Sequence, residues 1–142
     1  MSKEAGEQSS SVAGARATRQ RAAIEAALQS EGAFLTAQEL YGVLGRGSTR
    51  VGLTTIYRNL QSMAERGEVD VVRRADGESM YRRCDRDEHH HHLVCRSCGY
   101  SIEIDNPDLE SWATTTARRH GFTLETHDLE LFGLCESCAT AR

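Results

Sequence analysis

The residues most able to do chemistry in this chain are cysteines and histidines, and most of them lie in one short stretch. Residues 84–98 hold four of the six histidines and three of the five cysteines. A further Cys-x-x-Cys pair follows near the C-terminus, at Cys135 and Cys138. Imidazole and thiolate together are the ligands that a borderline-soft divalent metal prefers. The sequence therefore predicts a metal-binding protein.

Two Cys-x-x-Cys pairs, Cys95 with Cys98 and Cys135 with Cys138, supply the four thiolates of a closed structural zinc site. The 36 residues between the pairs exceed the gap of about 15–20 residues usual in zinc ribbons. The intervening chain must therefore return to its start, as a strand, a helix and a strand would do. A redox dithiol or inert buried cysteines are the alternatives, but two such pairs in one small chain favour zinc.

For the remaining candidate ligands, the residues alone allow a role other than metal binding. Cys84 is not needed for the four-thiolate site, so it is either a further ligand or a small buried apolar residue. His120 is expected to complement the C-terminal end of a helix, whereas His127, in a polar break, is a better ligand candidate. Glu110 is explained by its place in the first turn of a helix, where it complements the helix dipole.

The bulk composition is that of a globular protein rather than a disordered one, with 27% charged and 39% hydrophobic residues. No apolar run approaches about 18 residues, so no membrane partner is expected. The N-terminus lacks the apolar core of a signal peptide, which predicts a cytoplasmic protein. Thiols stay reduced there, so the paired cysteines are expected to be metal ligands and not disulfides.

The charge is divided unevenly between the two halves of the chain. Residues 1–83 carry twelve Lys and Arg against ten Asp and Glu, whereas residues 84–142 carry five against eleven. This difference in charge indicates that the two halves of the chain have different functions. We expect a disordered tail over residues 1–15, a DNA-binding domain over 16–84 and a metal-binding dimerisation domain over 85–142.

The elements that must position these residues begin with three helices. Apolar spacing and capping residues predict them at about residues 18–30, 36–45 and 54–66, with Thr18 and Thr54 as N-caps of the first and third. Strands 69–74 and 79–83 follow, joined by a tight turn at Asp76-Gly77. Three helices and a hairpin make a winged helix-turn-helix. A turn of two residues would pair Val69 with Cys84, and so place Asp70 within one residue of Cys84.

The third predicted helix offers a polar face suited to a DNA major groove. Arginine reads guanine edges or phosphate, and threonine or tyrosine carbons contact a thymine methyl. An ordinary amphipathic helix is the alternative, but the hairpin behind it favours DNA. Arg16, Arg19 and Arg21 gather at the start of the first helix, either as solvated charges or as phosphate contacts. The residues expected to contact DNA are Arg16, Arg19, Thr54, Thr55, Tyr57, Arg58, Arg73 and Arg74.

The C-terminal half is expected to be a small α/β domain. A strand is predicted over 100–105, a helix capped by Asn106 with Pro107 at its first position, and strand-like sequence over 122–134. So small and aromatic-poor a domain is expected to need metal and a partner subunit for stability. The overall fold class is α+β.

Four segments of the chain carry specific motifs: 51–60 (Val-Gly-Leu-Thr-Thr-Ile-Tyr-Arg-Asn-Leu), 81–84 (Tyr-Arg-Arg-Cys), 89–99 (His-His-His-His-Leu-Val-Cys-Arg-Ser-Cys-Gly) and 131–135 (Leu-Phe-Gly-Leu-Cys). Together they resemble the Fur family of metal-dependent repressors, and they match most closely its branch of zinc uptake regulators in actinobacteria. The match covers about residues 16–138. The resemblance implies a homodimer that binds an inverted-repeat, double-stranded DNA operator when metal-loaded and releases it when metal is scarce.

The resemblance also implies three metal sites, and hence up to three zinc ions per subunit. Alternate side chains of an extended strand share a face, so His90 and His92 are expected to serve one metal, and His89 and His91 another. The implied ligands are Cys95, Cys98, Cys135 and Cys138 for structural zinc, Asp70, Cys84, His90 and His92 for a regulatory zinc, and His89, His91, Glu110 and His127 for an additional zinc.

The function predicted from these features is a zinc-responsive transcriptional repressor that controls zinc uptake and homeostasis genes. A thiolate at the regulatory site favours zinc over iron or manganese. Relatives that sense iron, nickel or peroxide share the fold and are the main alternative. A zinc-buffering protein would leave the winged helix unexplained. An enzyme is disfavoured because the chain has no His-Glu-x-x-His motif, and no small-molecule substrate is expected.

Overall fold

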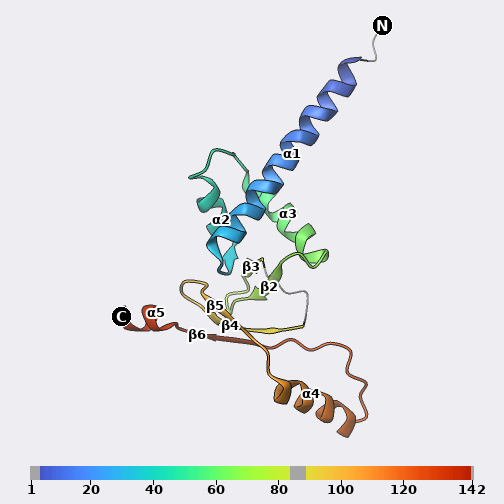
Figure 1. Ribbon diagram of the computed structural model, residues 1–142, viewed down its shortest axis with the longest axis vertical. Helices are drawn as coiled ribbons and strands as arrows, with labels where there is room; N and C mark the ends of the chain where they lie inside the picture. The colour runs from blue at the N-terminus through green and yellow to red at the C-terminus, as the bar shows by residue number, and fades with distance from the viewer. Residues whose placement is uncertain (1–3, 84–88, 142) are drawn as a thin grey trace. The chain divides into compact units, whose positions relative to one another are not determined.

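The computed structural model describes residues 4–83 and 89–141, with side chains inside the first helix from residue 12 onward (Figure 1). The chain forms two compact units, residues 1–85 and 86–142. No helix in the described part is long and apolar enough to cross a membrane. The first unit contains α1 (Glu4–Glu31), β1 (Leu35–Thr36), α2 (Ala37–Leu44), α3 (Leu53–Glu65), β2 (Asp70–Arg73) and β3 (Ser79–Arg82). The second contains β4 (His91–Cys95), β5 (Ser101–Ile104), α4 (Pro107–Arg119), β6 (Glu130–Gly133) and α5 (Glu136–Thr140).

The first unit is a winged helix-turn-helix, as predicted. Its three helices share a core in which Leu28, Leu40 and Leu60 are completely buried. Burying a leucine side chain contributes about 1.5–3 kcal/mol, so the helices are held mainly by this shared apolar face. The antiparallel sheet beside them has the order β1-β3-β2, in which β2 and β3 form the wing. The two-residue strand β1 was too short for its sequence pattern to predict.

The first helix begins earlier than the sequence predicts. Thr18 is not an N-cap, because its Oγ1 donates to the Gly14 carbonyl at 2.9 Å inside α1. The helix extends back over residues 4–15, for which the composition predicts a disordered tail. This stretch contains no proline, and adding residues to a helix already nucleated by packing of its C-terminal half is far easier than starting one.

The ends of α2 and α3 follow local rules. Thr36 and Glu39 form the predicted capping box of α2, with the Glu39 amide donating to Thr36 Oγ1 at 3.1 Å. The N-cap of α3 is Gly52 instead of the predicted Thr54, because the Gly52 carbonyl already accepts the amide of Ile56. The helix stops at Gly67, whose φ of 70° suits a residue without a side chain.

The wing turn is one residue longer than predicted, and this corrects the register. The Gly77 amide donates to the Arg74 carbonyl, and the Arg74 amide donates to the Glu78 carbonyl, each at 2.9 Å. With Gly77 at a φ of 85°, this is a three-residue loop closed by a glycine bulge. Asp70 therefore pairs with Arg82, two residues before Cys84, and the predicted one-residue separation is wrong. Cys84 itself lies outside the described residues.

The second unit is built on a mixed sheet of order β5-β4-β6, in which β4 is antiparallel to β5 and parallel to β6. Asn106 caps α4 by accepting the Asp108 amide, and Pro107 is its first residue, as predicted. Only 130–133 of the predicted 122–134 strand forms. Phe122 is 71% exposed and lies outside the sheet, and the polar residues 125–128 separate it from β6. The short helix α5 was not predicted.

Candidate metal centres and nucleic-acid interface

The four paired cysteines meet at one end of the mixed sheet. Cys95 ends β4, and the turn after it closes through the Gly99 amide, which donates to the Cys95 carbonyl at 2.9 Å. Gly99 adopts a φ of 79°, which lets the turn bring Cys98 back toward Cys95. The Arg96 amide donates to the Gly133 carbonyl, and this hydrogen bond holds the segment that leads to Cys135 beside the first cysteine pair. The crossover through α4 thus returns to its start, as the long spacing predicts.

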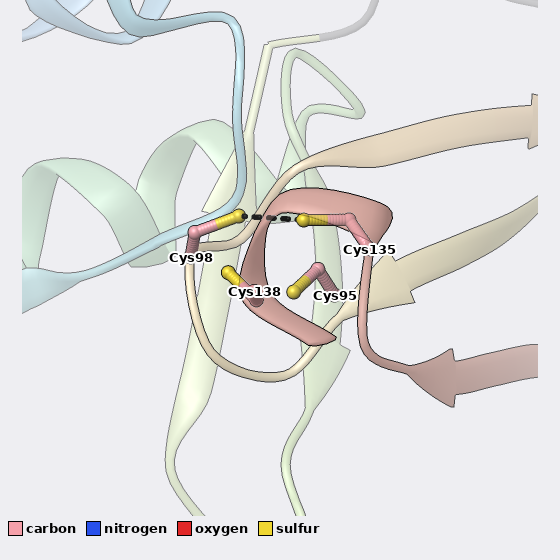
Figure 2. A group of neighbouring side chains, drawn as sticks. All are labelled: Cys95, Cys98, Cys135 and Cys138. Carbon is pink, nitrogen blue, oxygen red and sulfur yellow. Dashed lines mark hydrogen bonds between the residues drawn. The ribbon is translucent and has the colours of Figure 1, made fainter. Parts of the chain in front are cut away.

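The sulfur atoms of these residues, the cysteine cluster, converge on a common centre (Figure 2). Their Sγ atoms all lie within 4.8 Å of one another, and those of Cys98 and Cys135 are 3.8 Å apart. Tetrahedral zinc with Zn–S bonds of about 2.3 Å places its sulfur atoms about 3.8 Å apart. The cluster, Cys95, Cys98, Cys135 and Cys138, therefore fits a zinc ion in both chemistry and size.

The thiols of the cysteine cluster differ in their readiness to ionise. Hydrogen bonds from the backbone amides of Cys135 and Cys98 lower the pKa of Cys95 to about 6. The neighbouring Cys135 thiol raises the pKa of Cys138 to about 12. Four thiolates this close repel one another, so a proton is held on some of them until a cation takes its place.

A second group of donors, the histidine cluster, joins β4, α4 and the chain before β6. His91 Nε2 lies 2.9 Å from Glu110 Oε1, and His127 Nε2 lies 2.7 Å from Glu110 Oε2. His89 Nε2 lies 3.2 Å from His91 Nε2 and 3.0 Å from His127 Nε2. Tetrahedral zinc with bonds of about 2.0–2.1 Å separates its ligand atoms by about 3.3 Å. Three Nε2 atoms and one carboxylate at these distances form a donor set that a small divalent cation fits.

Glu110 has a second role that its position at the start of a helix did not predict. Its place in the first turn of α4 suits the helix dipole, but the same turn also directs its carboxylate at His91, which is 2% exposed. Partial burial raises the pKa of Glu110. The hydrogen bond with His91 and the charges of His127 and His89 lower it, and together they outweigh burial, so the net pKa is below its usual value. The carboxylate is thus held in the ionised form that a metal ligand requires.

The four residues implied for the regulatory site are described only in part. His90 comes just before β4 and His92 lies in it, and their ring centroids are 4.7 Å apart, as expected when alternate side chains of an extended chain share a face. Asp70 belongs to the other unit, where it opens β2 and is half-buried. Cys84 lies outside the described residues. Joint metal binding by this set, which we call the hinge set, stays a prediction.

Sequence reasoning missed one acidic residue beside these ligands. Glu130 opens β6 and pairs directly with His92 of β4, and its Oε2 lies 3.1 Å from His92 Nδ1. The available signal was an acidic residue set in an apolar run, between Leu129 and Leu131. The sequence alone does not show that Glu130 faces His92, because this depends on the parallel pairing of β4 with β6.

The predicted DNA-contacting residues of α3 are accessible. Thr54, Tyr57 and Arg58 are exposed, and Thr55 is half-buried. The opposite face of α3 carries the buried Ile56, Leu60 and Met63, so the helix packs by one side and offers the other. The structure thus leaves a polar helix face open at the surface, as a reading helix requires.

The arginines outside α3 divide into open and paired ones. Arg16, Arg19 and Arg73 are exposed. Arg74, by contrast, holds Asp76 at 3.0 Å across the wing turn. Arg21, considered for phosphate contact, instead binds Glu68 at 2.9 Å and Glu25 at 3.1 Å, and so links α1 to the chain between α3 and β2.

Comparison with known proteins decides the family. The family model described as the ferric uptake regulator family matches residues 12–132. The chain belongs to the ferric uptake regulator family. Among ferric uptake regulator relatives, it is 52% identical over 129 residues to the zinc uptake regulation protein of Mycobacterium tuberculosis, covering 90% of this chain and 98% of that one. It is 33% identical over 108 residues to the ferric uptake regulation protein of Bordetella parapertussis, covering 76% and 77%.

Solved structures of ferric uptake regulators agree with this placement. The crystal structure of FurB from M. tuberculosis, a zinc uptake regulator, is 52% identical, with a TM-score of 0.56 and coverage of 90% and 98%. The Vibrio cholerae ferric uptake regulator is 32% identical, with a TM-score of 0.67 and coverage of 82% and 88%. A zinc uptake regulator complexed with zinc and DNA is 25% identical, with a TM-score of 0.64 and coverage of 86% and 82%. The resemblance inferred from the four sequence segments is confirmed.

Proposed function

We propose that this ferric uptake regulator is a zinc-responsive transcriptional repressor. In its zinc-loaded form a homodimer binds an inverted-repeat operator, and it represses genes for zinc uptake and homeostasis. It acts in the cytoplasm and catalyses no reaction. The observation that carries the proposal is that one chain holds both an open polar face on α3 and two tight clusters of metal donors.

Zinc is the metal that these donors favour. The cysteine cluster is a soft four-thiolate set with sulfur spacing suited to tetrahedral zinc. The hinge set adds a further thiolate, Cys84, which iron and manganese regulators built on nitrogen and oxygen would not need. The zinc uptake regulation protein that is 52% identical supports the same choice. We assign one zinc ion to each of the three sets.

The homodimer is supported by the apolar surface of the second unit. All thirteen residues of α4 are described and none is buried. Trp112 is 65% exposed, Phe122 71% and Leu131 45%. A unit that leaves this much apolar surface open is poorly stabilised alone and gains from a partner. Dimerisation would also present two α3 helices to the two halves of an inverted repeat.

Control of DNA binding is assigned to the hinge set. Asp70 and Cys84 precede the second unit, whereas His90 and His92 belong to it. Zinc bonded to side chains from both units would restrict their relative movement. Restricting that movement in both subunits would set the spacing of the two α3 helices, and thereby couple zinc to operator affinity.

On the DNA, the exposed residues of α3 are assigned to the major groove. Arg58 supplies a guanidinium for a guanine edge or a phosphate, and Thr54, Thr55 and Tyr57 supply carbon and hydroxyl contacts. Arg73 on the wing and the exposed Arg16 and Arg19 on α1 are assigned to phosphates, which fix position without reading sequence. Arg74 is assigned to a phosphate as well, and to reach one its side chain would have to leave or share its ion pair with Asp76.

A mobility-shift experiment on promoter DNA of candidate zinc-transport genes tests the proposal. The protein is assayed with zinc, with iron(II), with nickel and with a chelator, on the promoter and on a scrambled sequence of equal length. We expect specific retardation with zinc and its loss with chelator. Retardation that depends on iron or nickel would move the assignment to another sensor of the same family. Absence of specific binding under every metal condition would favour a zinc-buffering role.

A further inference from the structure

We propose that Glu130 is a positioning residue that prepares His92 to bind the regulatory zinc through its Nε2 atom. The inference rests on the proposed function, because it concerns a ligand of the hinge set. It assigns to Glu130 no bond to the metal. Its role is to hold the proton and the ring of His92 in the arrangement that a metal ligand requires.

The contact between these residues is fixed by the backbone as well as by the side chains. His92 and Glu130 are direct partners in the parallel pairing of β4 with β6, so their side chains leave the sheet on the same face. The distance from His92 Nδ1 to Glu130 Oε2 is 3.1 Å. His92 is 3% exposed, so its ring has little freedom to turn away from the carboxylate.

The chemistry of imidazole gives this contact a consequence. A neutral histidine carries one N–H and one lone pair, and only the nitrogen with the lone pair can bind a metal. A carboxylate accepts a hydrogen bond but cannot donate one when ionised, so the proton of His92 is held on Nδ1. The lone pair is then on Nε2, on the far side of the ring. An anionic partner at Nδ1 also makes Nε2 a stronger donor.

The histidine cluster shows the same choice of donor atom in this chain. The nitrogen atoms that converge there are the Nε2 atoms of His89, His91 and His127. Glu110 differs from Glu130, because its oxygen atoms approach those Nε2 atoms directly and so belong to the donor set itself. Glu130 contacts Nδ1 of His92, so it can orient this ligand without itself bonding to a metal bound at Nε2.

The test uses the full-length protein with the cysteine-cluster zinc retained, in four forms. They are the wild type, Glu130→Ala, Glu130→Gln and the control Glu125→Gln, which removes one exposed acidic charge from the same unit. The glutamine at position 130 keeps an acceptor oxygen for the His92 N–H but loses the charge. Circular dichroism and the retained zinc content check folding. A His90→Ala variant identifies which event in a zinc titration belongs to the hinge set.

Two readouts are measured. Long-range nitrogen–proton NMR correlations, assigned with a His92→Asn variant, report the tautomer of His92 before hinge zinc is added. We expect the Nδ1–H form in the wild type, in Glu130→Gln and in the control, and a mixture in Glu130→Ala. Competition titration reports zinc affinity. We expect Glu130→Ala to weaken the hinge event by about 10–100-fold, Glu130→Gln by less, and the control to leave it unchanged.

Three results would overturn the inference: a wild-type His92 in the Nε2–H form, an unchanged hinge affinity in Glu130→Ala, or equal losses in Glu130→Ala and Glu130→Gln. Equal losses would make Glu130 a ligand or a source of bulk charge. If Glu130→Ala fails to fold, the wild-type tautomer and the Glu130→Gln titration still decide. Neither readout involves DNA. A protein with the expected tautomer and affinities but no zinc-dependent operator binding would refute the proposed function alone.

Discussion

His91 and His92 are consecutive residues of β4, yet their rings contact different carboxylates. His91 Nε2 lies 2.9 Å from Glu110, and His92 Nδ1 lies 3.1 Å from Glu130. Successive side chains of a strand point to opposite faces, so one short strand supplies donors to two separate groups. The ring pairs follow the same alternation, with centroids 4.7 Å apart both for His89 with His91 and for His90 with His92.

Separate replacement of His89 and His90 by alanine should remove two different zinc-binding events. His89 belongs to the histidine cluster with Glu110 and His127, whereas His90 faces His92. Calorimetric titration of each variant, compared with the wild type, measures which event is lost. His120, exposed at the end of α4, provides the control, and His120→Ala should keep both events. Loss of the same single event in both variants would mean that the quartet forms one site.

Replacing Cys135 by serine should unfold the second unit. Cys135 supplies one sulfur of the cysteine cluster and also the backbone amide that lowers the pKa of Cys95. In a structural site of this kind the free energy of zinc binding is part of the free energy of folding. Circular dichroism, size-exclusion chromatography and metal analysis measure the outcome, with exposed Ser137→Ala as control. A folded, dimeric, zinc-free Cys135→Ser protein would contradict the structural role.

Replacing Arg58 by alanine should weaken specific operator binding by about 1–3 kcal/mol if the guanidinium reads a base edge. If Arg58 instead contacts a phosphate, the replacement should weaken binding to all sequences alike. The slope of log affinity against log salt concentration should then become shallower by about one unit. Fluorescence anisotropy on operator and scrambled DNA, at several salt concentrations, separates the two. Gln61→Ala, exposed further along α3, is the matched control. Equal affinities for wild type and Arg58→Ala would remove this part of α3 from the interface.

Much of the fold could be predicted because its signals are local. The capping box of Thr36 and Glu39 and the Asn106-Pro107 start of α4 depend on residues within one turn. Apolar residues at helical spacing, such as Ile56 and Leu60, mark a buried face before any partner is known. The cysteine cluster was also predictable, because two Cys-x-x-Cys pairs in one small chain have few uses other than metal binding.

The parts that could not be predicted depend on tertiary register. The wing slips by one residue because Gly77 forms a bulge, a choice among turns that Asp76-Gly77 alone does not determine. Glu110 meets His91 only because the fold brings together two residues that are 19 positions apart in the chain. Glu130 meets His92 only through a parallel pairing across 38 residues of chain. Residue types alone therefore indicated donors, but not which carboxylates would face them.

The wing turn should lose part of its stability in acid. Hydrogen bonding from the Glu78 backbone amide, and then from the Arg74 side chain, holds the pKa of Asp76 below its usual value. Because the folded pKa is the lower one, this contribution is present above the unfolded pKa of about 3.9 and disappears as pH falls through the folded pKa. The difference in unfolding free energy between wild type and Asp76→Asn should therefore be constant at neutral pH and shrink below about pH 4. A difference that is independent of pH down to pH 2 would contradict this assignment.

Replacing Cys84 by serine should leave a folded dimer that binds the operator poorly at ordinary zinc concentrations. The cysteine cluster does not include Cys84, so structural zinc and folding should be retained. In the proposed mechanism, zinc at the hinge set joins Asp70 and Cys84, from the DNA-binding side, to His90 and His92 in the dimerisation side. Without the thiolate the bond between the sides is weak, and the two α3 helices no longer hold one operator spacing. Operator affinity is measured by anisotropy across buffered zinc concentrations, with the apo wild type as the lower reference and Ser79→Ala, elsewhere on the wing, as the folding control. We expect the zinc response of Cys84→Ser to move to much higher zinc concentrations. If its response coincides with that of the wild type, the hinge set is not the sensor, and the histidine cluster becomes the candidate.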